Sequence, residues 1–155
     1  MTTAQVRTIP YSATTVRMTG ATLDNTGDIV GPDPNATGPW QLAGGKVQGG
    51  TITELELTSS STLDGVILEA DLTVSAGRTL TIQNGLTLNG TLTLAGYYYN
   101  YSYPSTLSFV GAQTLAGTGQ VVLFRGGNNP YNLSLIHISE PTRLRRISYA
   151  VFCLK

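Results

Sequence analysis

The chain has 155 residues, which is enough for one domain, and only 12% of them are charged. Its balanced charge and 41% hydrophobic content are not typical of a disordered chain, and no apolar run is long enough for a membrane helix. The only Cys and the only His are Cys153 and His137. Residues 1–132 therefore hold neither a disulfide nor a Cys/His metal site, and we expect no cofactor.

Residues 1–39 show no regular pattern. Residues 14–19 fit one short strand, and the prolines and turn formers of residues 31–35 indicate a loop. We expect an irregular N-terminal cap or a degraded first turn of a repeat, because terminal repeats are usually atypical. No basic start followed by an apolar core is present, so no signal peptide is visible and we interpret the N-terminus as incomplete.

An internal repeat begins near residue 40. An apolar residue followed by Thr recurs at an even interval, at Ile52-Thr53, Leu72-Thr73 and Leu92-Thr93. Glycines recur at the same interval, at Gly45, Gly65 and Gly85. In a solenoid, like residues of successive turns form columns. We therefore expect one inward column of Ile52, Leu72 and Leu92, and one outward column of the threonines that follow them.

Within the repeats, apolar residues alternate with Thr in short runs. These runs are residues 72–74, 80–82, 86–88 and 92–94. A period of two places the apolar residues on one face of a strand and Thr on the other. The runs are separated by small residues that tolerate tight corners. These corners are Ala76-Gly77, Asn84-Gly85, Asn89-Gly90 and Ala95-Gly96.

Two folds share these signals. Asn-Gly between alternating runs is typical of hairpins, which would give an antiparallel meander or sandwich. A fixed spacing of about 20 residues is instead typical of leucine-rich and β-helical turns. A meander needs no such spacing, so we favour the solenoid.

A tyrosine-rich segment interrupts the repeat. The interval from Leu92 to Leu115 is longer than the earlier intervals, and the extra length falls around Tyr97–Pro104. We predict a loop or broad turn leaving the solenoid, and loops on repeat scaffolds often carry binding residues. Tyr suits sugar rings or protein partners, although the rings could instead cover the solenoid side. The candidate binding residues are Tyr97, Tyr98, Tyr99, Tyr101 and Tyr103.

The Gly and Thr patterning stops at Asn132. One set of codons for residues 133–143 resembles a transposase-type sequencing-library adapter, and codons for residues 147–155 resemble the far end of that adapter. Residues 144–146 fall where a variable index would lie. We therefore interpret residues 133–155 as translated adapter. The alternative is a basic C-terminal helix that caps the solenoid or binds an acidic surface.

The repeats of residues 46–52, 63–66, 72–77 and 84–92 are patterns of small residues, Thr and branched apolar residues. They resemble the repeats of large bacterial surface proteins of the filamentous-haemagglutinin and autotransporter passenger type. The similarity covers roughly Trp40 to Asn129. It implies an extracellular, right-handed parallel β-helix that serves as a stalk or adhesin, and it implies no catalytic residues.

Two pairs of acids are candidates for general acid–base chemistry, which needs two carboxylates near one another. Glu54 and Glu56 lie two residues apart on an expected strand and would share a face, as would Glu69 and Asp71. Exposed strands also carry acids for solubility, and these acids do not align at the interval of the repeat. We therefore favour solvated acids over a catalytic site.

The sequence thus predicts an all-β fold, a truncated single-stranded parallel β-helix with a right-handed coil and about 20 residues per turn. The expected domains are a cap or degraded turn over residues 1–39, the β-helix over residues 40–132, and an adapter-derived artefact over residues 133–155. We expect a non-enzymatic structural or adhesive segment of a secreted or cell-surface bacterial repeat protein. The alternative is a carbohydrate-binding or carbohydrate-acting, pectin-lyase-like β-helix.

The expected partners are surface glycans, or host or neighbouring proteins, at the tyrosine-rich segment. Residues 1–132 carry five basic and eight acidic residues, a net charge of −3, which disfavours nucleic acid as a partner. We also expect no membrane insertion and no metal site.

Overall fold

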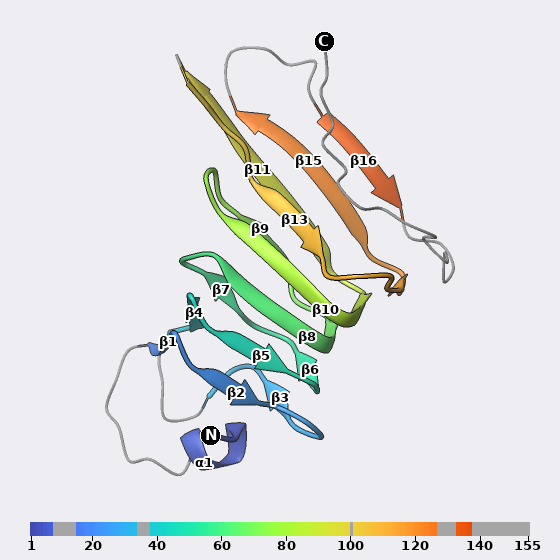
Figure 1. The fold of residues 1–155 in the computed structure, drawn as a ribbon. Helices are drawn as coiled ribbons and strands as arrows, with labels where there is room; N and C mark the ends of the chain where they lie inside the picture. Colours follow the sequence, from blue (N-terminus) through green and yellow to red (C-terminus); the bar gives the residue numbers. More distant parts are fainter. Residues whose placement is uncertain (8–14, 34–37, 100, 127–132, 138–155) are drawn as a thin grey trace.

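The computed structural model describes residues 1–7, 15–33, 38–99, 101–126 and 133–137 (Figure 1). In these residues nearly all regular structure is β-strand, and the single helix is the five-residue α1 (Thr3–Arg7). The predicted all-β class is confirmed. No helix of the described part is long and apolar enough to cross a membrane.

The largest sheet has eight strands, and all of its pairings are parallel. Its main order is β13 (Thr106–Phe109), β10 (Thr79–Leu88), β8 (Ser61–Leu68), β5 (Lys46–Gln48) and β2 (Thr22–Asp24). Three short strands pair beside the second halves of these, namely β3 (Ile29–Val30), β6 (Thr51–Ile52) and β14 (Leu115–Ala116). Parallel strands need a connection that crosses back, so an antiparallel meander is excluded for this part of the chain.

We call the stretch of chain from one strand of the large sheet to the next a row. Two smaller sheets contain the other strands of these rows (Figure 1). One consists of parallel strands β1 (Val16–Thr19), β4 (Trp40–Ala43) and β7 (Glu56–Leu57). The other holds β9 (Leu72–Val74), β11 (Thr91–Tyr99) and β15 (Gln120–Gly126) in parallel, with β12 (Tyr101–Tyr103) and β16 (Leu133–His137) added antiparallel. In the described residues these two sheets are separate, because β7 pairs with β4 and β9 pairs with β11, and β7 does not pair with β9.

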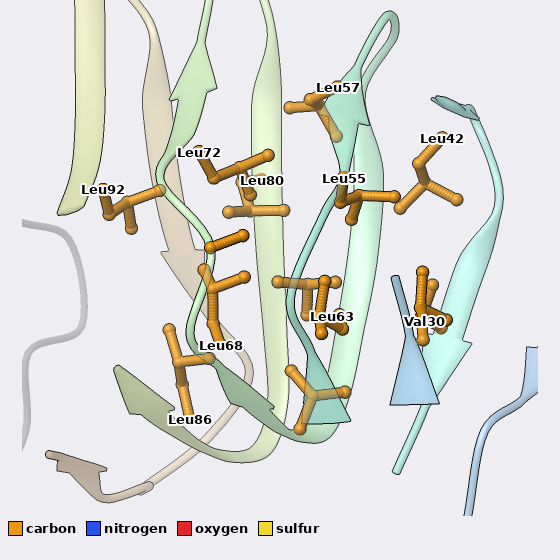
Figure 2. Close-up of a cluster of buried hydrophobic side chains, with 14 of the residues drawn as sticks. Val30, Leu42, Leu55, Leu57, Leu63, Leu68, Leu72, Leu80, Leu86 and Leu92 are labelled. Carbon is orange, nitrogen blue, oxygen red and sulfur yellow. The ribbon is translucent and has the colours of Figure 1, made fainter. Parts of the chain in front are cut away.

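The core lies between the sheets and is lined by every second residue of their strands. In β10, Leu80, Ile82 and Leu88 are fully buried, while Thr81 and Thr87 are only partly buried. Figure 2 shows Leu and Val side chains from successive strands converging in one apolar cluster. The alternation of Leu with Thr therefore sets the inward face, as predicted.

The predicted column of three residues is right for two of them. Leu72 lies opposite Leu92, and Thr73 lies opposite Thr93, at the interval that the repeat predicts. Ile52 was placed wrongly, because it pairs with Val30 and Leu68 in the large sheet.

The spacing between paired residues also varies along the chain. Lys46 lies opposite Thr62, sixteen residues later, whereas Thr79 lies opposite Thr106, twenty-seven residues later. Leu115 pairs with Leu86 and not with Leu92. The predicted repeat length therefore holds only for some pairs of strands. It differs elsewhere because the corners between strands vary in length.

The predicted Asn-Gly corner at residues 84–85 is a bulge inside β10. The register with β8 shifts between Gln83 and Leu86, and both Asn84 (φ 53°) and Gly85 (φ 91°) have left-handed backbones. Such conformations suit Asn and Gly. Ala95-Gly96, by contrast, was expected to be a corner but continues β11.

The N-terminal residues cover the outer edge of β2. Thr2 bridges to Asp24, and the amide of Asp24 donates to the Met1 carbonyl at 2.9 Å. The Thr3 hydroxyl donates to the buried Asn25 Oδ1 at 2.7 Å. Strands β1, β2 and β3 each pair in parallel with the strand that follows one row later.

Candidate functional site

The tyrosine-rich segment forms an antiparallel β-hairpin, where the sequence predicted a loop or broad turn. Strand β11 pairs with β9 only over Leu92–Leu94 and then continues to Tyr99. Beyond that point β12 turns back along it. We call residues 97–99 and 101–103 the tyrosine hairpin. Figure 1 shows β11 extending beyond the end of β9.

The register of the tyrosine hairpin pairs four of its five tyrosines across the two strands. Tyr97 lies opposite Tyr103, and Tyr99 lies opposite Tyr101. Tyr98 lies opposite Ser102.

Backbone contacts tie the base of the tyrosine hairpin to the stack. The Pro104 carbonyl accepts a hydrogen bond from the Gly77 amide at 3.1 Å, and the Thr106 amide donates to the Arg78 carbonyl at 2.9 Å. On its other edge, Tyr97 lies opposite Gly126 of β15. The base of the hairpin is therefore held by both neighbouring rows of the fold.

Neither of the two predicted acid pairs lies together on one strand, as was expected. Glu54 lies in a bend, outside β7, while Glu56 begins β7 and its Oε2 accepts from Gln41 Nε2 at 2.7 Å. Glu69 and Asp71 lie between β8 and β9, and Asp71 Oδ1 accepts from the Thr91 amide at 2.7 Å. The prediction of shared strand faces was wrong, because Glu54 lies before β7 begins and Glu69 and Asp71 lie between two strands.

A polar cluster on the outer face of the large sheet was not predicted. Asp64 Oδ2 accepts from Lys46 Nζ at 2.8 Å, and Asp64 Oδ1 accepts from Asn84 Nδ2 at 2.6 Å. Lys46 Nζ also lies 3.5 Å from Gln83 Oε1. These contacts join the rows of β5, β8 and β10. No local pattern in the sequence indicates them, since the partners lie 18 and 20 residues apart.

The surroundings of Asp64 keep it charged. The hydrogen bond from Lys46 lowers the pKa of the Asp64 carboxyl most, and the bond from Asn84 lowers it further. Burial acts in the opposite direction but is the weaker effect. A carboxyl with a lowered pKa is poorly suited to act as a general acid at neutral pH. The cluster therefore has the properties of a structural contact between rows.

Arg78 links the two smaller sheets, which are not joined to each other by strand pairing in the described residues. Its Nη1 donates to the Leu57 carbonyl of β7 at 2.7 Å. Among the described residues, no group of three or more His, Cys, Asp or Glu could hold a metal ion.

The described part of the chain also contains an apolar cavity of about 460 Å³ at its N-terminal end. It lies between α1 and strands β1 and β2, and Val6, Met18 and Leu23 contribute to its wall. Arg17 is the charged residue in this wall.

Comparisons with known proteins give no relative. No family model matches the chain, and neither the curated proteins nor the solved structures include a significant match.

Proposed function

We propose that residues 40–132 are a segment of a right-handed parallel β-helix, with residues 1–39 as its cap or first turn. The protein would be secreted or exposed on a bacterial cell surface, with a non-enzymatic role as a structural and adhesive segment. The observation that carries this proposal is the repeated parallel pairing of strands about one turn apart, with inward Leu and outward Thr. Such a stack grows by adding turns, which suits a stalk.

The acids that accept hydrogen bonds within the fold support a structural role. Asp64, Asp71 and Glu56 each accept a hydrogen bond from a neighbouring row, at 2.6–2.8 Å. A polysaccharide-cleaving site needs carboxylates that face a substrate. These acids instead stabilise the contacts between successive rows.

Recovery of the complete gene would test this proposal. We expect a secretion signal, further Leu-Thr repeats after Asn132 and an anchoring domain. The enzymatic alternative is tested by incubating the protein with polygalacturonate and neutral polysaccharides and measuring new reducing or unsaturated ends. Turnover that persists in a highly purified preparation would contradict the non-enzymatic role.

We further propose that residues 133–155 are translated adapter and are not part of the natural protein. The two codon resemblances support this, as does the loss of the Gly and Thr pattern after Asn132. Strand β16 pairs antiparallel with β15, unlike the parallel pairing between rows. An open strand edge recruits such segments readily, because its backbone groups lack partners.

A further inference from the structure

We propose that residues 1–7 form a cap that stops a second copy of this chain from extending the large sheet at its N-terminal edge. This inference goes beyond the structural and adhesive role proposed above, because it names a partner that the fold excludes. The main path of the large sheet ends at β2 on one side and at β13 on the other, and all of its pairings are parallel. Parallel edges of this kind can join head to tail in successive copies, which gives an open-ended filament.

The two edges of the large sheet have the same layout. At the N-terminal edge β2 is followed by the shorter β3, and at the C-terminal edge β13 is followed by the shorter β14. Among the described strands, β13 and β14 pair only with β10. The amides of Thr106 and Val110 donate to β10, so the amide of Leu107 between them points away from it. An edge with such outward groups is a template for another strand.

The cap binds the outward backbone of β2. The amide of Asp24 donates to the Met1 carbonyl at 2.9 Å, whereas the next amide, that of Asn25, donates to β5. The Thr3 hydroxyl donates to Asn25 Oδ1 at 2.7 Å, and Asn25 Nδ2 donates to the Thr51 carbonyl at 3.1 Å. Thr3 and Asn25 are both fully buried. The cap is therefore connected to the following row through a buried side chain.

Side chains block the outward groups of β3. The carbonyls of Asp28 and Val30 accept hydrogen bonds from the following row, so the groups of Ile29 between them point outward. The Ile29 amide donates to Asp28 Oδ1 at 2.8 Å, and the Ile29 carbonyl accepts from Arg7 Nη2 at 2.8 Å. Neither group of Ile29 is left for an incoming strand, and covering an edge in this way prevents pairing between copies.

The sequence of the cap also fixes its shape. Thr2 and Gln5 form a capping box, in which the Gln5 amide donates to Thr2 Oγ1 at 3.2 Å and the Thr2 amide donates to Gln5 Oε1 at 2.9 Å. Val6 packs into the hydrophobic core, while Ala4 of the same helix is exposed. Figure 1 shows α1 at the end of the stack, next to β2. One side of α1 therefore covers the stack and the other meets water.

Sedimentation velocity of the full chain and its variants would test the proposal. Val6→Asp places a charge beneath α1, and Thr3→Val combined with Arg7→Met removes polar contacts of the cap without adding a charge. Ala4→Asp is the matched control, because it adds the same charge to the exposed side of α1. Leu107→Pro, combined with Val6→Asp, removes an outward amide from β13. Circular dichroism follows the fold, and amide hydrogen exchange over residues 22–30 follows the release of the cap.

We expect the original chain and Ala4→Asp to stay monomeric. Both variants that release the cap should keep their circular-dichroism spectrum and exchange faster over residues 22–30. They should also form elongated oligomers, with an association constant at least about tenfold higher than that of the original chain. Adding Leu107→Pro should return Val6→Asp to the monomer.

The proposal is overturned if both release variants remain monomeric, or if the original chain or Ala4→Asp associates to the same extent as they do. Association that Leu107→Pro does not reduce would also overturn it, because the second copy would then not pair through β13. Loss of the circular-dichroism spectrum in both release variants would overturn it as well, because residues 1–7 would then be needed for folding itself.

Discussion

Leu72 in β9 lies directly opposite Leu92 in β11, in parallel register and one repeat earlier in the chain. Both side chains are buried, with 2% and 0% exposed. The neighbouring pair, Thr73 and Thr93, is on the other face, and Thr73 is exposed. Adjacent residues of one strand thus occupy opposite environments.

This contrast predicts very different effects for the same substitution. Leu72→Asp should destabilise the protein by at least about 3 kcal/mol or prevent folding, because it places an unpaired carboxylate in an apolar column. Thr73→Asp should change the free energy of unfolding by less than about 1 kcal/mol, because its side chain meets water. Thermal melts followed by circular dichroism would measure both. Similar shifts in the two variants would mean that the inward and outward faces are misassigned.

Asp64 predicts a pH dependence of stability. Because its pKa is lowered in the folded protein, the unfolded chain takes up the proton first as the pH falls. The stabilisation by this carboxylate is therefore complete above its unfolded pKa of about 3.9, and it is lost as the pH falls through the lower, folded pKa. Asp64→Asn should cost about 1 kcal/mol at pH 7 and should reduce the loss of stability on acidification.

The exposed Glu69 supplies the control for Asp64. Glu69→Gln removes one carboxylate from the same part of the chain and should leave both the stability at pH 7 and its pH profile nearly unchanged. Urea titrations at several pH values from about 2 to 7 would compare the three proteins and cover the range in which Asp64 takes up its proton. If Asp64→Asn follows the original chain at every pH, the contacts from Lys46 and Asn84 do not stabilise the fold.

Arg78 predicts a local effect between the two smaller sheets. Arg78→Met should cost about 1–2 kcal/mol, because the Leu57 carbonyl loses its donor in a partly buried position. Amide hydrogen exchange should also become faster in β7 and β9 than elsewhere. Arg17→Met is the matched control, since Arg17 is exposed on β1. Equal changes in the two variants, or uniform exchange throughout the chain, would argue against a bridging role for Arg78.

The sequence predicts strands better than it predicts which strands pair. Alternation of Leu and Thr locates residues 72–74 and 86–88 correctly, because burial of every second side chain dictates that pattern. The column of Ile52 was wrong because corners differ in length and the spacing between paired residues is not constant.

The candidate sites follow the same rule. Clustering of five tyrosines is visible in the sequence, but the pairing of Tyr97 with Tyr103 and of Tyr99 with Tyr101 depends on the register of the tyrosine hairpin, which no local pattern specifies. Similarly, the contact of Lys46 with Asp64 depends on β5 and β8 lying side by side. The amino-acid composition shows which residue types are unusually frequent, whereas the pairing of the strands decides which residues lie next to one another.

The final prediction concerns residues 133–155. If they are translated adapter, they were never selected to pack on this fold, and a chain ending at Asn132 should lose less than about 1 kcal/mol of stability. Leu92→Ala is the positive control. It should lower the free energy of unfolding by about 2–5 kcal/mol, because Leu92 is fully buried, and it shows that the melt detects a loss of packing. The genomic locus gives the decisive measurement: we expect a further Leu-Thr repeat after Asn132, pairing in parallel where β16 now pairs antiparallel. A locus that encodes His137 and Cys153, or a truncated chain that no longer unfolds cooperatively, would show that these residues belong to the protein.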